Sequence, residues 1–186
     1  MTNPARPRRS VLYMPGANAR ALDTARSLPA DALILDMEDA VAPDSKQLAR
    51  EQVCAAITQG GYGKREIIVR INGFDSPWGD ADLRAVAAVK PDAVLVPKVS
   101  SPAVLHKAEA VLNAAGANTT MLWAMMETPL GILHAEEIAA STKRLAVFVM
   151  GTNDIAKEMR SAHTPLRLPM ITSLGLCLLA ARAYGV

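Results

Sequence analysis

The sequence predicts an α/β fold of the (β/α)8 TIM-barrel type, with about six of the β/α units present in this chain. Apolar runs typical of strands alternate with helical patterns along all 186 residues, which is the element order of a parallel sheet. These runs are apolar on both faces, as in strands that helices cover. At about 31 residues a unit, eight units would need about 248 residues, near the usual size of such a barrel.

One domain is expected. No linker or low-complexity stretch interrupts the chain, so residues 1–186 are predicted to form a single, incomplete β/α-barrel domain, with residues 1–8 as a flexible tail. An open doubly wound sheet is the alternative. It is disfavoured because Pro15-Gly16-Ala17-Asn18 lacks the glycine spacing of a dinucleotide-binding turn.

The elements follow in order along the chain. The predicted strands open near Ser10, Ala32, Glu66, Ala93, Thr120 and Leu145. Between the first two, Asn18 is a candidate cap for a helix that runs to Ser27. Asp44 and Gln47 resemble a capping box for a helix that runs towards Gly60.

The later helices have proline at their first position. Ser101-Pro102 begins one that ends before Gly116, and Thr128-Pro129 begins another. A long apolar helix from Pro169 to Tyr184 closes the chain and has almost no polar face. Such a helix is buried on most sides, so we expect it to cover other subunits, most simply in a homo-oligomer built on a dimer.

Composition excludes several classes of protein. The net charge is only +2 and the basic residues are scattered, so no nucleic-acid partner is expected. No apolar run approaches membrane-spanning length, and the first residues lack the apolar core of a signal peptide. Cys54 and Cys177 lie among apolar helical residues and are expected to be buried free thiols in a reducing compartment, which favours the cytoplasm.

Polar and charged residues collect where the predicted strands end. The ends are Tyr13-Met14-Pro15-Gly16, Asp36-Met37-Glu38-Asp39, Arg70-Ile71-Asn72, Pro97-Lys98, Glu127 and the region of Asp154. A barrel brings all these ends to one rim, where active sites of this architecture lie. A single such residue is as easily part of a structural ion pair, but six successive strand ends favour a functional site.

Two carboxylates at neighbouring strand ends predict a site for a hard cation. Glu127 and Asp154 suit Mg²⁺, which takes few protein carboxylates and keeps waters and substrate oxygens. Arg70 offers a planar fork for a substrate carboxylate or a developing oxyanion, and is expected to take part in catalysis. Glu38 and Asp39 are interpreted as catalytic partners that accept from metal-bound waters or pair with Arg70.

Two further rim residues have less defined roles. Asp36 is expected to point elsewhere and to hold the rim together. Lys98 either balances the acids or forms a structural salt bridge. Neither a G-x-S-x-G turn nor a cysteine at a strand end is present, which disfavours an acyl-enzyme hydrolase.

Six motifs in this order resemble the citrate lyase β-subunit-like family of the HpcH/HpaI aldolase superfamily, which includes malyl-CoA and citramalyl-CoA lyases. They are Arg9-Ser10-Val11-Leu12-Tyr13-Met14-Pro15-Gly16, Asp36-Met37-Glu38-Asp39-Ala40-Val41, Val69-Arg70-Ile71-Asn72, Val96-Pro97-Lys98, Glu127-Thr128-Pro129-Leu130-Gly131 and Gly151-Thr152-Asn153-Asp154. The resemblance extends from about Arg8 to the last residue.

The resemblance implies a Mg²⁺-dependent barrel that makes or breaks a carbon–carbon bond between an acetyl thioester and a 2-oxo acid. By motif, Glu127 and Asp154 match the metal ligands and Arg70 the substrate arginine. Tyr13 and Arg20 match positions that contact a CoA-type substrate. Two departures are Asn153, where many members have an acid, and the lack of the last two β/α units after Val186.

The function expected is therefore a Mg²⁺-dependent lyase acting on a 3-hydroxyacyl thioester of CoA or an acyl carrier, such as citramalyl-CoA, malyl-CoA or a citryl thioester. One alternative is an aldolase that acts on a free hydroxy-oxo acid without CoA. Another is a non-catalytic subunit that binds the metal or ligand only.

Overall fold

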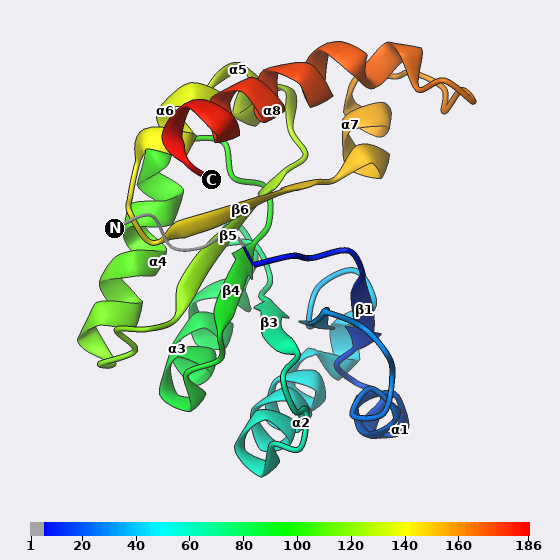
Figure 1. Ribbon diagram of the computed structural model, residues 1–186. Coiled ribbons are helices and arrows are strands. Elements are labelled where there is room, and N and C mark those ends of the chain that lie inside the picture. Colours follow the sequence, from blue (N-terminus) through cyan, green and yellow to red (C-terminus); the bar gives the residue numbers. More distant parts are fainter. Residues whose placement is uncertain (1–5) are drawn as a thin grey trace.

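The computed structural model describes residues 6–186 and contains one six-stranded sheet whose outer face is covered by helices (Figure 1). The strands are β1 (Val11–Pro15), β2 (Ala32–Asp36), β3 (Glu66–Arg70), β4 (Ala93–Val96), β5 (Met121–Met126) and β6 (Leu145–Met150). They pair in sequence order, and every pairing is parallel. The predicted α/β fold of successive β/α units is confirmed.

Helices follow each strand. They are α1 (Ala19–Thr24), α2 (Lys46–Gln59), α3 (Gly79–Val89), α4 (Pro102–Ala114), α5 (Pro129–Leu133), α6 (Ala135–Ala140), α7 (Thr152–Glu158) and α8 (Ile171–Tyr184), with short 3-10 turns at Pro43–Ser45 and Leu168–Met170.

The helix caps agree with the sequence in part. Asn18 accepts a hydrogen bond from the backbone N–H of Ala21, and Thr128 caps α5 in the same way. The predicted capping box at Asp44 is wrong: a 3-10 turn occupies this segment, and α2 begins at Lys46 without a side-chain cap.

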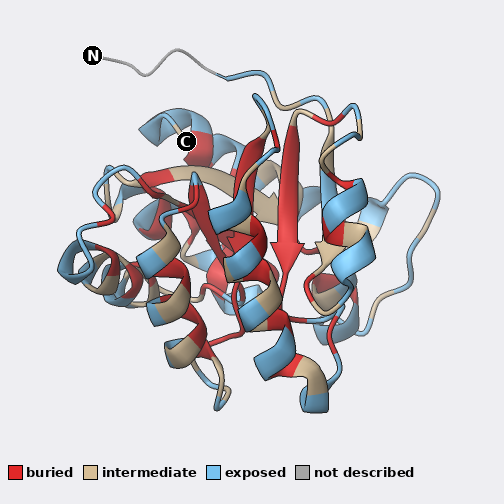
Figure 2. Ribbon diagram, turned by 90° about the horizontal axis from the view of Figure 1, so that it is seen from below, coloured by how far each residue is buried: buried red, intermediate tan, exposed pale blue. Residues whose placement is uncertain are grey.

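Alternate strand residues face two separate apolar layers. One set packs between the sheet and the helices and forms the larger core. The other set faces the concave side of the sheet: Ala32, Ile34, Ile68, Ala93, Leu95, Trp123 and Met125. Figure 2 shows the inner strands buried and the outward faces of the helices exposed, whereas the edge strands β1 and β6 are only partly buried. This arrangement is that of a barrel wall, with a packed interior and a helical outer ring.

The segment before β1 closes the amino-terminal end of this interior. Arg8 donates to both carboxylate oxygens of Glu66, at 2.6 and 2.9 Å, and its guanidinium lies 5.2 Å from the centre of the Trp123 ring. A flexible tail would not make such contacts, so Arg8 departs from the expected tail of residues 1–8. Residues 1–5 of that tail lie outside the described part of the chain.

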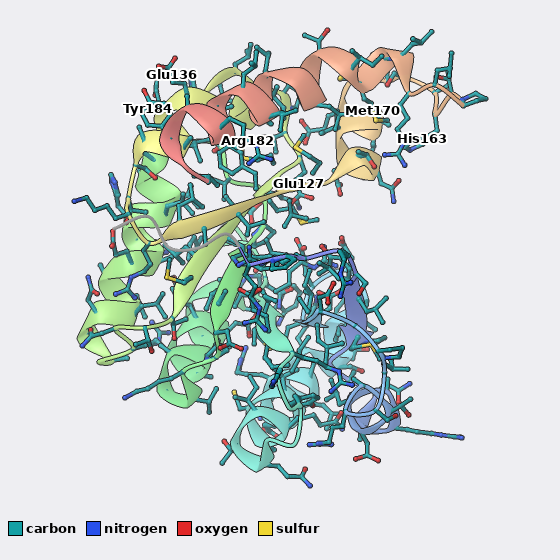
Figure 3. The ribbon with its side chains drawn as sticks, viewed as in Figure 1. Glu127, Glu136, His163, Met170, Arg182 and Tyr184 are labelled. Atoms are coloured by element: carbon teal, nitrogen blue, oxygen red, sulfur yellow. The ribbon has the colours of Figure 1, made fainter. Side chains whose placement is uncertain are left out.

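The sheet has two free edges within residues 6–186. β1 and β6 pair with only one neighbour each, and β6 is half-buried along most of its length. Helix α8 lies across α5 and α6 beside β6, where the Tyr184 hydroxyl donates to Glu136 Oε1 (Figure 3). In this part of the chain, no helix is both long and apolar enough to cross a membrane.

Candidate metal and substrate site at the carboxyl ends of the strands

Arg70 occupies the last position of β3 and is paired in register with Asp36, the last residue of β2. Arg70 Nε donates to Asp36 Oδ1 at 2.7 Å, and Nη2 donates to Asp36 Oδ2 at 2.5 Å. Both side chains are buried. The expectation that Asp36 points elsewhere is therefore wrong, because one edge of the Arg70 fork is fully used by this carboxylate.

The remaining donor group of Arg70 faces the other two acids of the loop after β2. Nη1 donates to Asp39 Oδ2 at 3.1 Å, and it lies 3.0 Å from Glu38 Oε2. The Glu38 contact is an ion pair without a well-directed N–H bond, so this buried oxygen has no hydrogen-bond partner. Of the predicted partners of Arg70, both are thus in place, and Asp39 is the more exposed.

Tyr13 and Arg20 are placed differently. The Tyr13 ring lies 5.0 Å from the Arg70 guanidinium, so it belongs to the same cluster and is partly exposed. Arg20 is an exposed residue of α1 and forms no ion pair or side-chain hydrogen bond within residues 6–186. The structure does not bring Arg20 into contact with the other predicted residues.

Glu127 follows β5 and is 1% exposed. Its Oε1 accepts from the backbone N–H of Lys98 at 2.8 Å. A Cβ placed on Gly151 would lie 2.5 Å from both Cβ and Oε2 of Glu127. The carboxylate therefore fits against bare backbone at the end of β6, where it lies in Figure 3.

Lys98 contributes both its main chain and its charge. It has a left-handed backbone conformation, with φ of 50°, and its N–H points to Glu127. Its side chain forms no salt bridge in the described part of the chain, but its charge opposes the effect of burial on the pKa of Glu38, as expected of a lysine that balances the acids.

Asp154 does not end β6, as the sequence suggested. The strand ends at Met150, and Asp154 lies in the first turn of α7. It is half-buried and close enough to Glu127 for its charge to raise the pKa of that carboxyl. The two acids are thus close to each other, as predicted, although a short segment separates Asp154 from the end of β6.

Burial perturbs the acids of this site. It raises the pKa of Glu127 to about 7, an effect that the Lys98 N–H opposes and the charge of Asp154 increases. Burial likewise raises the pKa of Glu38 to about 8, although Arg70 acts in the opposite direction. The pKa of Arg70 is lowered by burial, but its hydrogen bonds and charge contact with Asp36 outweigh this and raise it.

The donor set fits a small divalent cation. A buried, negatively charged carboxylate beside a second acid is costly unless a cation compensates both. Within residues 6–186, no three His, Cys, Asp or Glu side chains converge as a ready metal site. Glu127 and Asp154 would therefore need oxygen ligands from water or substrate, which is how Mg²⁺ is commonly held.

Sequence reasoning missed the layer beneath these residues. Asn72 donates from its side chain to Met37 O and to Asp82 Oδ2, at 2.9 and 2.6 Å. Asp82 in α3 is buried and also accepts from Arg50 at 2.7 Å. Lys46 donates to main-chain carbonyls of the acidic loop, which is the segment after β2 that carries Glu38 and Asp39. These contacts depend on helix packing, which strand-end patterns do not reveal.

Other potentially reactive side chains lie outside this cluster. His163 lies in the exposed loop after α7 (Figure 3). Cys54 and Cys177 are both free thiols, as expected, but Cys54 is only half-buried.

The chain is similar in sequence and in structure to known proteins. The chain is 55% identical over all its 186 residues to "(3S)-malyl-CoA thioesterase" of Cereibacter sphaeroides (strain KD131 / KCTC 12085), and it spans 63% of that protein. Two solved structures from Mycobacterium tuberculosis are similar. One is the citrate lyase beta subunit with oxaloacetate and magnesium, with a TM-score of 0.79 and 25% identity, covering 97% of this chain and 77% of that one.

The other is protein CitE with magnesium, acetoacetate and coenzyme A, with a TM-score of 0.77 and 25% identity, covering 97% of this chain and 64% of that one. The family model described as HpcH/HpaI aldolase/citrate lyase matches residues 9–186. This range contains the six strands, the Arg70 cluster and both candidate ligands. The chain belongs to the HpcH/HpaI aldolase/citrate lyase family.

Proposed function

We propose that this chain binds Mg²⁺ through Glu127 and Asp154 and is the core of a carbon–carbon lyase. Its substrate would be a 3-hydroxyacyl-CoA thioester such as malyl-CoA or citramalyl-CoA, or a citryl thioester, and its products an acetyl thioester and a 2-oxo acid. The observation that carries the proposal is the buried Glu127 carboxylate, held by Lys98 N–H beside Asp154. Magnesium and coenzyme A in a structure similar to this chain support it.

Each side chain has a proposed role. The cation, when bound, would supply a Lewis acid that polarises the oxygens of the 2-oxo acid. Arg70 would meet the substrate's negative charge with Nη1, the group that also contacts Glu38 and Asp39, because Asp36 fixes its other edge. Glu38 and Asp39 would orient Arg70 and accept from water at the cation. Tyr13 would line the substrate side of Arg70, and Arg20 would meet the thioester's distal, anionic part.

A second candidate is hydrolysis of the same thioester. It is favoured by the name of the relative that is 55% identical, a malyl-CoA thioesterase. Both reactions start from one substrate, and they differ in the bond that breaks: carbon–carbon in the lyase, carbon–sulfur in the thioesterase. The chain spans 63% of that relative's length, so the activity of the whole protein is part of the proposal.

One assay separates these reactions. Malyl-CoA and citramalyl-CoA are incubated with the protein and Mg²⁺, and glyoxylate or pyruvate is measured beside free CoA thiol. A lyase releases the 2-oxo acid without thiol, whereas a thioesterase releases thiol without the 2-oxo acid. Turnover of free hydroxy-oxo acids alone would indicate the aldolase without CoA, and Mg²⁺-dependent ligand binding without turnover would indicate a binding subunit.

The proposed metal ligands are tested by a binding measurement. Glu127→Ala and Asp154→Ala are each expected to abolish Mg²⁺-dependent binding of pyruvate or oxaloacetate, measured by calorimetry. Binding that survives in both variants, or that EDTA leaves unchanged in the parent protein, contradicts the assignment.

Location and assembly are also proposals. The two free cysteines favour the reducing cytoplasm. The exposed leucines of α8 favour a homo-oligomer in which a neighbouring subunit covers them.

A further inference from the structure

Lys46 is a buried cation in an unusual setting. It is the first residue of α2 and only 6% exposed. Its Nζ donates to Glu38 O at 2.7 Å and to Met37 O at 3.0 Å. Within residues 6–186 it forms no ion pair, so its contacts are with the main chain of the acidic loop.

This placement is costly for a lysine. Burial lowers the pKa of its ammonium group, although the charge of Glu38 acts in the opposite direction. A cation in the first turn of a helix also opposes the helix dipole. The Trp78 ring, 5.4 Å from Nζ, compensates in part. Helix formation alone therefore does not account for a lysine at this position.

The acidic loop is fixed through its backbone. Met37 N–H donates to Arg70 O at 2.9 Å, and Glu38 N–H donates to Asp36 Oδ1 at 2.8 Å. Met37 O accepts from Asn72 as well as from Lys46. Glu38 O has Lys46 as its side-chain donor.

The Glu38 side chain, in contrast, is not held by its own hydrogen bonds. Its Oε2 is buried without a partner, although it lies 3.0 Å from Arg70 Nη1. The position of the carboxylate therefore depends on the conformation of the backbone at residue 38. Lys46 donates to two successive carbonyls of that backbone.

We propose that Lys46 is a positioning residue, which holds the Met37–Glu38 main chain so that the Glu38 carboxylate faces Arg70. This inference rests on the proposed function for its catalytic consequence, but not for its structural one. Lys46 Nζ donates to the carbonyls of the loop and to no carboxylate of the site.

The structural consequence is tested by hydrogen exchange. In Lys46→Met, the amides of residues 36–41 are expected to exchange about tenfold faster, because two anchoring bonds are lost. Lys46→Arg, which keeps donors for both carbonyls, should restore slow exchange. Lys143→Met, an exposed lysine before β6, is the matched control and should change nothing. If Lys46→Met does not fold, Lys46→Gln, whose shorter and neutral side chain keeps an amide NH2 as donor, carries the same comparison.

The catalytic consequence is tested by a double-mutant cycle. Lys46→Met should lower kcat/KM, or Mg²⁺-dependent pyruvate affinity, about tenfold in the parent and less than about twofold in a Glu38→Ala background. Equal losses in both backgrounds overturn the proposal, as does unchanged exchange of residues 36–41. If the parent neither turns over nor binds these ligands, the proposed function fails, and the exchange result alone decides the role of Lys46.

Discussion

Glu127 and Gly151 belong to different β/α units, yet their atoms meet closely at the end of the sheet. Glu127 is nearly inaccessible, and its carboxylate rests against the Gly151 main chain. Glycine is needed here because of space and not because of backbone conformation, since its φ is −82°. The position of a proposed metal ligand thus depends on a residue without a side chain.

Gly151→Ala is expected to weaken Mg²⁺ binding more than tenfold, because the new methyl group would displace the Glu127 carboxylate. Calorimetry measures the affinity, and circular dichroism checks the fold. Gly175→Ala is the matched control: no atom lies within 4 Å of its added Cβ, and this helical position should gain about 0.5–1 kcal/mol of stability. Unchanged Mg²⁺ affinity in Gly151→Ala would show that Glu127 is not a ligand.

Arg70→Lys tests the guanidinium fork. An ammonium carries its donors on a single nitrogen and cannot reproduce the planar fork, in which Nε and Nη2 bind Asp36 while Nη1 faces the other side. The affinity for a 2-oxo acid should fall more than tenfold, which is about 1.4 kcal/mol. Arg144→Lys is the control, since this arginine, just before β6, donates to the carbonyls of Ala117 and Thr120 before β5 and should affect stability alone. Equal affinities of parent and Arg70→Lys would reduce Arg70 to a structural ion pair.

At the scale of elements, β1 is attached to β2 by a carboxylate as well as by the sheet. Asp31, just before β2, accepts from the backbone N–H groups of Arg9 and Ser10 at 2.8 and 3.2 Å. The Arg9 guanidinium also donates to it, at 2.9 Å. The Arg9 side-chain bond is the main reason why the pKa of Asp31 is lowered to about 2.

This attachment predicts a pH dependence. Because the pKa is lower in the folded protein than the unfolded value of about 3.9, the stabilisation is fully present above that value and is lost as the pH falls towards about 2. The difference in free energy of unfolding between parent and Asp31→Asn should therefore be largest near about pH 5 and shrink near about pH 3. Denaturant titrations measure it, with the exposed Asp44→Asn as control. A difference that does not vary with pH would contradict this role.

The strands could be predicted from sequence because their burial is two-sided and their apolar runs are continuous. All six begin within a residue or so of the expected positions. Asp154 was assigned to a strand end because the apolar run before it does not reveal where Gly151 starts a helix. The pairing of Arg70 with Asp36 was missed because strand register, which places the two residues opposite each other, is a property of the sheet and not of either segment.

At the scale of the whole molecule, helix α8 is only partly covered by the rest of the protein. Its Leu178 and Leu179 are 58% and 71% exposed. A groove of about 480 Å³ lies along the junction of α8 with α5 and α6. It is lined by Ile132, Leu133, Ala135, Glu136, Leu176, Leu179, Ala180 and Ala183. The exposed leucines of α8 thus lie beside a groove lined mostly by apolar residues, and such a surface is a candidate for contact with another subunit.

An oligomer is therefore expected in solution, and Leu179→Glu should weaken it by placing a charge on this surface. Light scattering at micromolar concentration measures the mass of both proteins. Lys143→Met, at an exposed residue that does not line this groove, should leave the mass unchanged. A monomeric parent protein would contradict the expectation.

The contacts of Arg8 have a practical consequence for spectroscopy. The two tryptophans of the chain lie in different elements, Trp123 within β5 and Trp78 at the amino-terminal end of α3. Trp123 lies inside the sheet beneath Arg8, whereas Trp78 lies beside Lys46, behind the acidic loop. Each indole has a cation against its ring, so its emission is sensitive to local movement. In each single Trp→Phe variant, the remaining tryptophan would thus be the one indole probe. Trp123 would report on the amino-terminal end of the barrel interior, and Trp78 would report on ligand binding at the rim.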